Sequence, residues 1–248
     1  MKEQRKLNKG GKMLLLFTLV ISSIFLLRPF TVKADVNVNI NKETQIVTDL
    51  IGQYSINYTG DANFFGFYGY YENNNYNEMV KDTDFKATVD TIGKDKIVNS
   101  SIASLKKTDG ATQIEAAYLV WETSVQGKNN TDLVKKAANK AVYFAGSTDK
   151  GAFTKKVNAS YAAVDMREPH LGTKEYTFSC MYVDVTSVVQ KYGYGKYGVA
   201  NIPYAASMKT SNTDKGTHAG ESSSAWQLIV IEKNSKANVR AVSLKIGS

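Results

Sequence analysis

The sequence predicts an all-β protein: an antiparallel β-sandwich of jelly-roll-like type with one short helix, preceded by a signal peptide. Three observations predict this class. Short apolar segments recur along the chain, clusters of Gly, Asn, Asp, Ser and Lys separate them, and they do not alternate with regular amphipathic helices. Residues 35–248 are numerous enough for one large β-domain or two small domains that fold without disulfide bonds.

The N-terminus has the pattern of a secretory signal peptide. Five Lys and Arg residues among the first twelve precede an uncharged run from Met13 to Leu27. At about 1.5 Å per residue, this run is shorter than a bilayer core of about 30 Å. Val32, Lys33 and Ala34 indicate cleavage after Ala34, which predicts a secreted or extracellular protein without a membrane contact. The alternative is an uncleaved signal anchor.

After residues 1–34, the expected organisation is a leader or first strand over 35–60 and a β-sandwich domain over 61–248. Val36, Val38 and Ile40 alternate with Asn37 and Asn39, which is typical of a half-buried strand, although a flexible leader fits as well.

The remaining strands follow in order along the chain. Ile114 to Val125 and Trp226 to Ile231 are apolar on both faces, which predicts central strands. Five further segments have strand-like patterns: Ala141 to Ala145, Phe153 to Tyr161, Glu175 to Val183, Tyr197 to Tyr204 and Val239 to Ile246.

One short helix is expected after Asp184. Val185, Val188, Val189 and Tyr192 have helical spacing, Asp184 precedes them as an acidic cap, and Gly193 ends the run. The segment from Thr131 to Lys140 fits a helix or a solvated loop.

The charge of the chain is concentrated in the export signal. Residues 1–34 hold seven of the 31 basic and one of the 23 acidic residues, so the remainder has 24 basic and 22 acidic residues and a net charge of +2, against +8 for the whole chain. A nearly neutral domain does not predict nucleic-acid binding.

Cys180 is the single cysteine, so no internal disulfide can form, and we expect no disulfide-linked partner. Tyr176, Phe178, Cys180 and Tyr182 alternate onto one face of a strand, which favours a buried, unreactive thiol.

An aromatic cluster between Phe64 and Tyr76 is the most unusual local feature. It could form a ligand platform, because aromatic rings with polar groups stack on sugars. Strand aromatics that fill the sandwich core are the more frequent arrangement. The candidate ligand-binding residues are Phe67, Tyr68, Tyr70, Tyr71, Asn74 and Tyr76.

No pattern for catalysis, metal or cofactor binding stands out, so we expect a protein that is not an enzyme and needs no cofactor. Asp61, Asp82 and Asp84 are the nearest approach to a calcium site but lack EF-hand spacing. His170 and His218 lie in polar, loop-like surroundings, without a nucleophile elbow or zinc motif. Carboxylate pairs such as Asp165 with Glu168 occur often by chance.

Five segments, in order and spacing, resemble a domain of large bacterial surface proteins of the adhesin type. They are Asn99 to Leu105, Asp109 to Trp121, Tyr182 to Val189, Gly195 to Ile202 and Ala225 to Glu232. The resemblance covers residue 99 to the end. It implies a secreted or wall-associated β-sandwich near the N-terminus of an adhesin-like protein, and it carries over no active site.

Two features depart from that resemblance. Such proteins continue beyond the segment that matches Ala241 to Gly247, and none of Pro29, Pro169 and Pro203 follows a Leu as in a Leu-Pro-x-Thr-Gly sorting signal. We therefore expect a truncated product or a small secreted relative. The expected function is binding of a host extracellular or cell-wall polymer through loops. The alternatives are a carbohydrate-binding or carbohydrate-active protein and a purely structural spacer.

Overall fold

The computed structural model describes residues 37–39, 45–66, 74–75, 77–126, 137–167, 176–203 and 222–246. The chain divides into two compact units, 1–34 and 35–248, and every described residue belongs to the second. The signal segment Met13 to Leu27 and the candidate cleavage site after Ala34 therefore lie outside the described residues.

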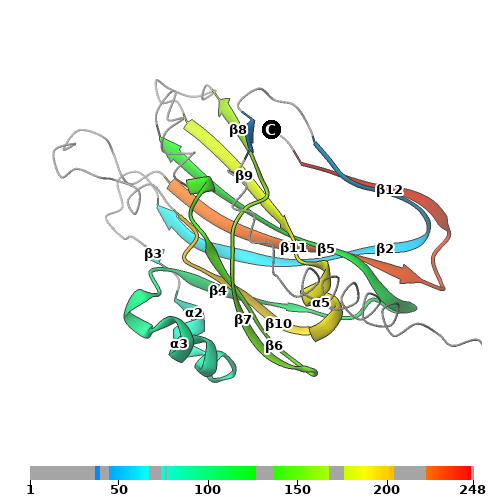
Figure 1. The fold of residues 1–248 in the computed structure, drawn as a ribbon, viewed down its shortest axis with the longest axis horizontal. Coiled ribbons are helices and arrows are strands. Elements are labelled where there is room, and N and C mark those ends of the chain that lie inside the picture. The colour runs from blue at the N-terminus through cyan, green and yellow to red at the C-terminus, as the bar shows by residue number, and fades with distance from the viewer. Residues whose placement is uncertain are drawn as a thin grey trace, which may run out of the picture. The chain divides into compact units, whose positions relative to one another are not determined.

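The described strands form two sheets, which confirms the predicted all-β sandwich (Figure 1). The large sheet has the order β1(Asn37–Asn39), β8(Tyr161–Arg167), β9(Tyr176–Asp184), β5(Ala111–Gln126), β11(Ser222–Asn234), β2(Gln45–Gly66) and β12(Val239–Ile246), and β3(Asn74–Asn75) pairs with β2. The small sheet has the order β4(Ser100–Leu105), β10(Gly195–Ala200), β6(Val142–Thr148) and β7(Gly151–Val157). The pairs are antiparallel except for β1 with β8, which is parallel.

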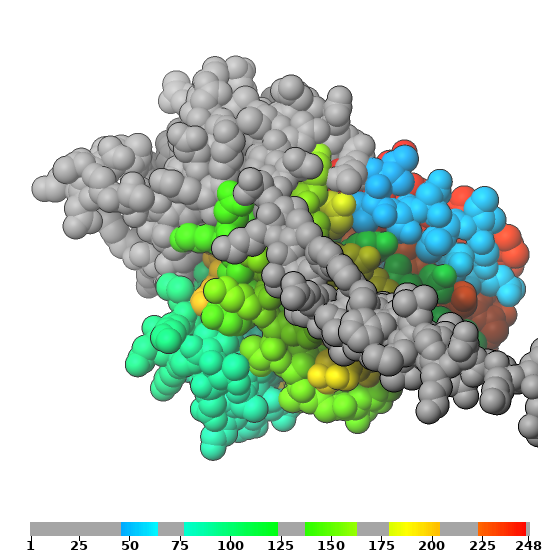
Figure 2. Space-filling model, viewed as in Figure 1, coloured from blue at the N-terminus to red at the C-terminus, as the bar shows by residue number. Residues whose placement is uncertain are grey.

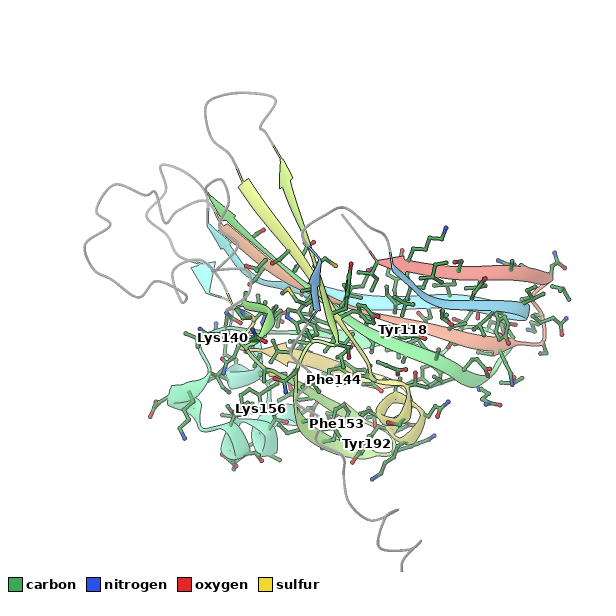
Figure 3. All side chains as sticks on the ribbon, turned by 45° about the horizontal axis from the view of Figure 1, so that its top comes forward. Tyr118, Lys140, Phe144, Phe153, Lys156 and Tyr192 are labelled. Atoms are coloured by element: carbon green, nitrogen blue, oxygen red, sulfur yellow. The ribbon has the colours of Figure 1, made fainter. Side chains whose placement is uncertain are left out.

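One hydrophobic core joins the two sheets. Trp121, Leu119 and Leu228 of the large sheet belong to the same buried cluster as Phe144 and Tyr197 of the small sheet. Both faces of β5 and β11 carry buried side chains, as expected for central strands. Figure 3 shows Phe144, Phe153 and Tyr192 gathered between the small sheet and α5(Thr186–Tyr192), away from Tyr118 on the large sheet.

The predicted helix is α5. The Asp184 carboxylate accepts the Thr186 backbone N–H at 2.8 Å, and Gly193 adopts a φ of +74°, which favours glycine at a helix end.

The prediction of a single helix was incomplete. The segment 78–96 folds into α2(Glu78–Lys81), α3(Lys86–Ile92) and the 3₁₀ turns η1(Thr83–Phe85) and η2(Lys94–Lys96). Met79, Phe85 and Ile92 from this segment pack on the small sheet, and Figure 2 shows its atoms beside those of β6 and β7.

Two predicted strand boundaries needed correction. The single strand expected from Phe153 to Tyr161 is divided between β7 and β8, because the chain crosses from the small to the large sheet over residues 158–160. The strand expected from Tyr197 to Tyr204 begins two residues earlier and ends at Ala200.

The strand β2 is longer than the sequence indicated and bends back near its middle (Figure 1). Residues 54–66 pair with β11, and residues 45–53 pair with β12. This two-stranded ribbon covers part of the outer face of the large sheet: Val242 and Ile246 of β12 pack with Tyr118, Tyr161 and Tyr182. Burial raises the pKa of Tyr118, to which Thr48 of the ribbon is hydrogen-bonded.

Side chains also cover the free edge of β4. The Asn57 amide donates to the Lys106 carbonyl oxygen at 2.6 Å, and the Thr59 hydroxyl donates to the Ser104 carbonyl oxygen at 3.0 Å. The Glu78 carboxylate accepts the Ile102 N–H at 2.7 Å. These contacts occupy backbone groups that an exposed edge strand would offer to another chain.

Candidate functional site

The ends of five strands meet at one end of the large sheet, here called the loop end. The pairing register places Gly66 of β2 opposite Ser222 of β11, and Gln126 of β5 opposite Tyr176 of β9, which in turn faces Arg167 of β8. The segments 67–73, 127–136, 168–175 and 204–221 therefore all begin or end at the loop end. Loops grouped at one end of a rigid sandwich are a frequent location for binding residues.

Most predicted ligand-binding residues lie in one of these segments. Phe67, Tyr68, Tyr70, Tyr71 and Tyr76 are outside the described residues, as are His170 and His218. The backbone of Asn74 forms β3 and pairs with Phe65. Asp165 lies on β8 opposite Phe178, whereas Glu168 is outside the described residues. The topology thus attaches the aromatic segment and both histidine-bearing segments to the loop end.

A buried polar network lies between the sheets near the loop end. The Asn63 amide donates to the Asn99 side-chain oxygen and to the Val199 carbonyl oxygen, each at 2.9 Å. The Ser101 hydroxyl donates to Asn63 Oδ1 at 2.6 Å and accepts the indole N–H of Trp226 at 2.7 Å. The network joins β2, β4, β10 and β11, and Asn63, Asn99 and Ser101 are all fully buried.

The outer face of the large sheet exposes an aromatic ring that the sequence analysis did not select. Tyr58 of β2 is 68% exposed and Ile56 is 56% exposed. The register places Tyr58 beside Ile229 of β11, and the exposed Gln227 opposite Gly60. An exposed ring beside an amide side chain is an arrangement that can stack on a sugar and hydrogen-bond to it. In the sequence, Tyr54, Ile56 and Tyr58 stand at alternate positions, and this pattern could have indicated that Tyr58 lies on one face of a strand.

The carboxylates of Asp82 and Asp84 both form ion pairs with a lysine side chain of the same protein. Lys196 Nζ lies 2.9 Å from Asp82 Oδ2 and 2.8 Å from Asp84 Oδ2. The hydrogen bond from Lys196 holds the pKa of Asp82 below its usual value, against a smaller opposing effect of burial. Asp61 is exposed on β2. Within the described ranges, no three His, Cys, Asp or Glu side chains gather as metal ligands.

Glu232 of β11 is a fully buried carboxylate that the sequence analysis did not select. The Tyr194 hydroxyl donates to it at 2.7 Å and the Ser55 hydroxyl at 3.1 Å. Longer contacts of 3.4 Å come from the Asn57 amide and the Thr108 N–H. Glu232 lies near the end of β11 opposite the loop end. In the sequence, the feature that could have indicated a buried carboxylate is an acidic residue directly after the apolar run Leu228 to Ile231.

Cys180 lies on the outer face of β9 and is half-buried. Burial, with a smaller contribution from the Glu122 carboxylate, raises the pKa of its thiol to about 11. This agrees with the unreactive thiol predicted from the strand pattern.

The comparisons with known proteins returned no relative: no family model, no curated protein and no solved structure matches this chain. Among the described residues, no helix is long and apolar enough to cross a membrane.

Proposed function

We propose that the N-terminal segment exports this chain and that residues 35–248 act as a non-enzymatic, adhesin-like protein, secreted or attached to the cell surface. In this proposal the protein binds a host extracellular or cell-wall polymer through the segments at the loop end. The observation that supports it is the register of the large sheet, which brings four connecting segments to one end. The segment with Tyr70 and Tyr71 and the segments with His170 and His218 are each joined to a strand that ends there, and loops attached to one end of a rigid sandwich are a frequent location for binding residues.

The test is an array of glycans and matrix proteins probed with residues 35–248. We expect saturable binding to at least one polymer, and we expect the double variant Tyr70→Ala/Tyr71→Ala to lose it. Lys236→Ala is the matched control, because Lys236 forms an exposed ion pair with Asp109 at the turn after β11, away from the loop end. Absence of any saturable ligand would favour a structural spacer instead.

Export is tested separately by fractionation of the producing cells and N-terminal sequencing. We expect the mature protein to begin at Asp35 in the medium or wall fraction. A protein that keeps Met13 to Leu27 and stays with the membrane would contradict this part of the proposal.

The exposed Tyr58 favours a second candidate, carbohydrate binding on the outer face of the large sheet. Under this candidate, Tyr58→Ala abolishes glycan binding, whereas Tyr58→Phe retains most of it because the ring supplies the stacking surface. Equal binding by both variants and the unaltered protein would exclude this face.

A further inference from the structure

A row of buried polar side chains crosses the inner face of the large sheet just before the loop end. Ser179 of β9 pairs with Thr123 of β5, and Thr123 pairs with Ser224 of β11. Asn63 of β2 lies at the register shift next to Ser224. All four side chains are at most 2% exposed. The interior at this end is therefore polar, in contrast to the apolar core around Phe144 and Tyr197.

Two members of the row find partners in the protein. Asn63 is bonded to Asn99, Ser101 and the Val199 carbonyl oxygen. The Ser179 hydroxyl donates to the Thr123 carbonyl oxygen at 3.2 Å. Asn63 and Ser179 therefore have hydrogen-bond partners despite their burial.

Three polar atoms on neighbouring residues have no such partner. Within the part of the chain that the structure describes, the hydroxyls of Thr123 and Ser224 and the indole N–H of Trp121 are buried and make no hydrogen bond. Thr123 and Ser224 are paired residues on the adjacent strands β5 and β11. Trp121 lies two residues before Thr123 on β5, with its side chain on the same face of the sheet. A buried polar group without a partner is costly, and three together on one face are rare in folded proteins.

We propose that Trp121, Thr123 and Ser224 form a buried binding site for ordered water at the loop end of the sandwich. An indole N–H only donates, whereas a hydroxyl both donates and accepts. Water can accept from the indole and exchange hydrogen bonds with both hydroxyls, which gives it three partners, the usual number for buried water. The three side chains are uncharged, so they offer no charge to hold an ion.

The water site is tested by whether removal of the Thr123 hydroxyl lowers the folding equilibrium constant or leaves it unchanged or higher. Thr123→Val preserves the shape of the side chain and removes its hydroxyl. If the hydroxyl is bonded to water, the folding equilibrium constant, measured by urea unfolding of the purified protein, falls roughly two- to tenfold. If the hydroxyl is unpaired, the constant stays the same or rises, which would overturn the proposal.

Thr59→Val is the matched control, since the Thr59 hydroxyl donates directly to the Ser104 carbonyl oxygen and the loss of this hydrogen bond must lower the folding equilibrium constant.

A crystal structure of the protein supplies the second measurement. We expect a water molecule within hydrogen-bond distance of at least two of the three atoms. A side chain from residues 204–221 in that position, or a dry apolar contact, would overturn the proposal whether or not any polymer binds to the protein.

Discussion

Trp226 on β11 donates its indole N–H to the hydroxyl of Ser101 on β4, 2.7 Å away, and so links the two sheets by a buried hydrogen bond. Ser101 in turn donates to Asn63 on β2. One hydroxyl therefore satisfies two buried groups on two different strands of the large sheet.

We expect Ser101→Ala to destabilise the fold by about 2 kcal/mol, because it leaves both the Trp226 indole and Asn63 Oδ1 without this partner in the interior. The measurement is the free energy of unfolding in urea. Ser243→Ala is the control, since Ser243 is exposed on β12. A cost for Ser101→Ala no larger than that of the control would show that the link is unimportant for stability.

The helical segment 78–96 requires a glycine beneath it. A Cβ at Gly198 of β10 would lie 2.4 Å from the Met79 Cε atom and 2.9 Å from the Ser101 carbonyl oxygen. We expect Gly198→Ala to cost about 1–3 kcal/mol of stability, as in other overpacked cores. Because Met79 is one of the two obstacles, combining Gly198→Ala with Met79→Ala should cost less than the sum of the single changes. Strict additivity in this double-mutant cycle would exclude Met79 as the obstacle.

The Lys196 ion pairs predict a dependence of stability on acid pH. The pKa of Asp82 is lower in the folded chain than its usual value, so the unfolded state takes up a proton first as the pH falls. The contribution of Asp82 is therefore complete at neutral pH and is lost as the pH falls below about 4. We expect the Tm of Lys196→Met to fall less between pH 6 and pH 3 than that of the unaltered protein.

Lys245→Met is the control for the removal of one exposed positive charge. Because the side chains of Lys196 and Asp84 are 40% and 50% exposed, 1 M salt should reduce the difference between Lys196→Met and the unaltered protein. Parallel pH profiles for the unaltered protein and Lys196→Met would refute the role of the pair.

The loss of one hydrogen bond to Glu232 should be costly, because this carboxylate is fully buried. We expect Tyr194→Phe to destabilise the protein by about 1.5–3 kcal/mol, the range for hydrogen bonds to charged groups. Tyr192→Phe is the control on the same segment. The prediction fails if urea unfolding gives the same free energy for both variants.

The fold class followed from strand-length apolar segments, and two of these segments match the observed strands closely. Val239 to Ile246 coincides with β12, and Ile114 to Val125 lies within β5. The segment 78–96 was missed because its helices are short and hold together by packing Met79, Phe85 and Ile92 on a sheet distant in sequence. Such tertiary contacts override local propensity.

The candidate site was predictable only in part. An aromatic-rich segment is visible in the sequence, but its attachment to the loop end depends on strand order, which a single sequence does not contain. Thr123 and Ser224 show the same limit: each is an ordinary polar residue in its own strand. Their shared burial appears only when β5 and β11 are paired.

Cys180 should react slowly in the native protein, because a pKa of about 11 leaves on the order of one thiol in a thousand ionised at pH 8. An ordinary thiol with a pKa of about 8.5 would be roughly a quarter ionised under the same conditions. We therefore expect the reaction with a disulfide reagent at pH 8 to be on the order of a hundredfold slower in the folded protein than in urea. The Glu122 carboxylate contributes to the raised pKa, so Glu122→Gln should increase the native rate and shift the pH profile of the reaction to lower pH. A native rate equal to the rate in urea would show that the β9 thiol is accessible and ionises normally, contrary to its position on the covered outer face.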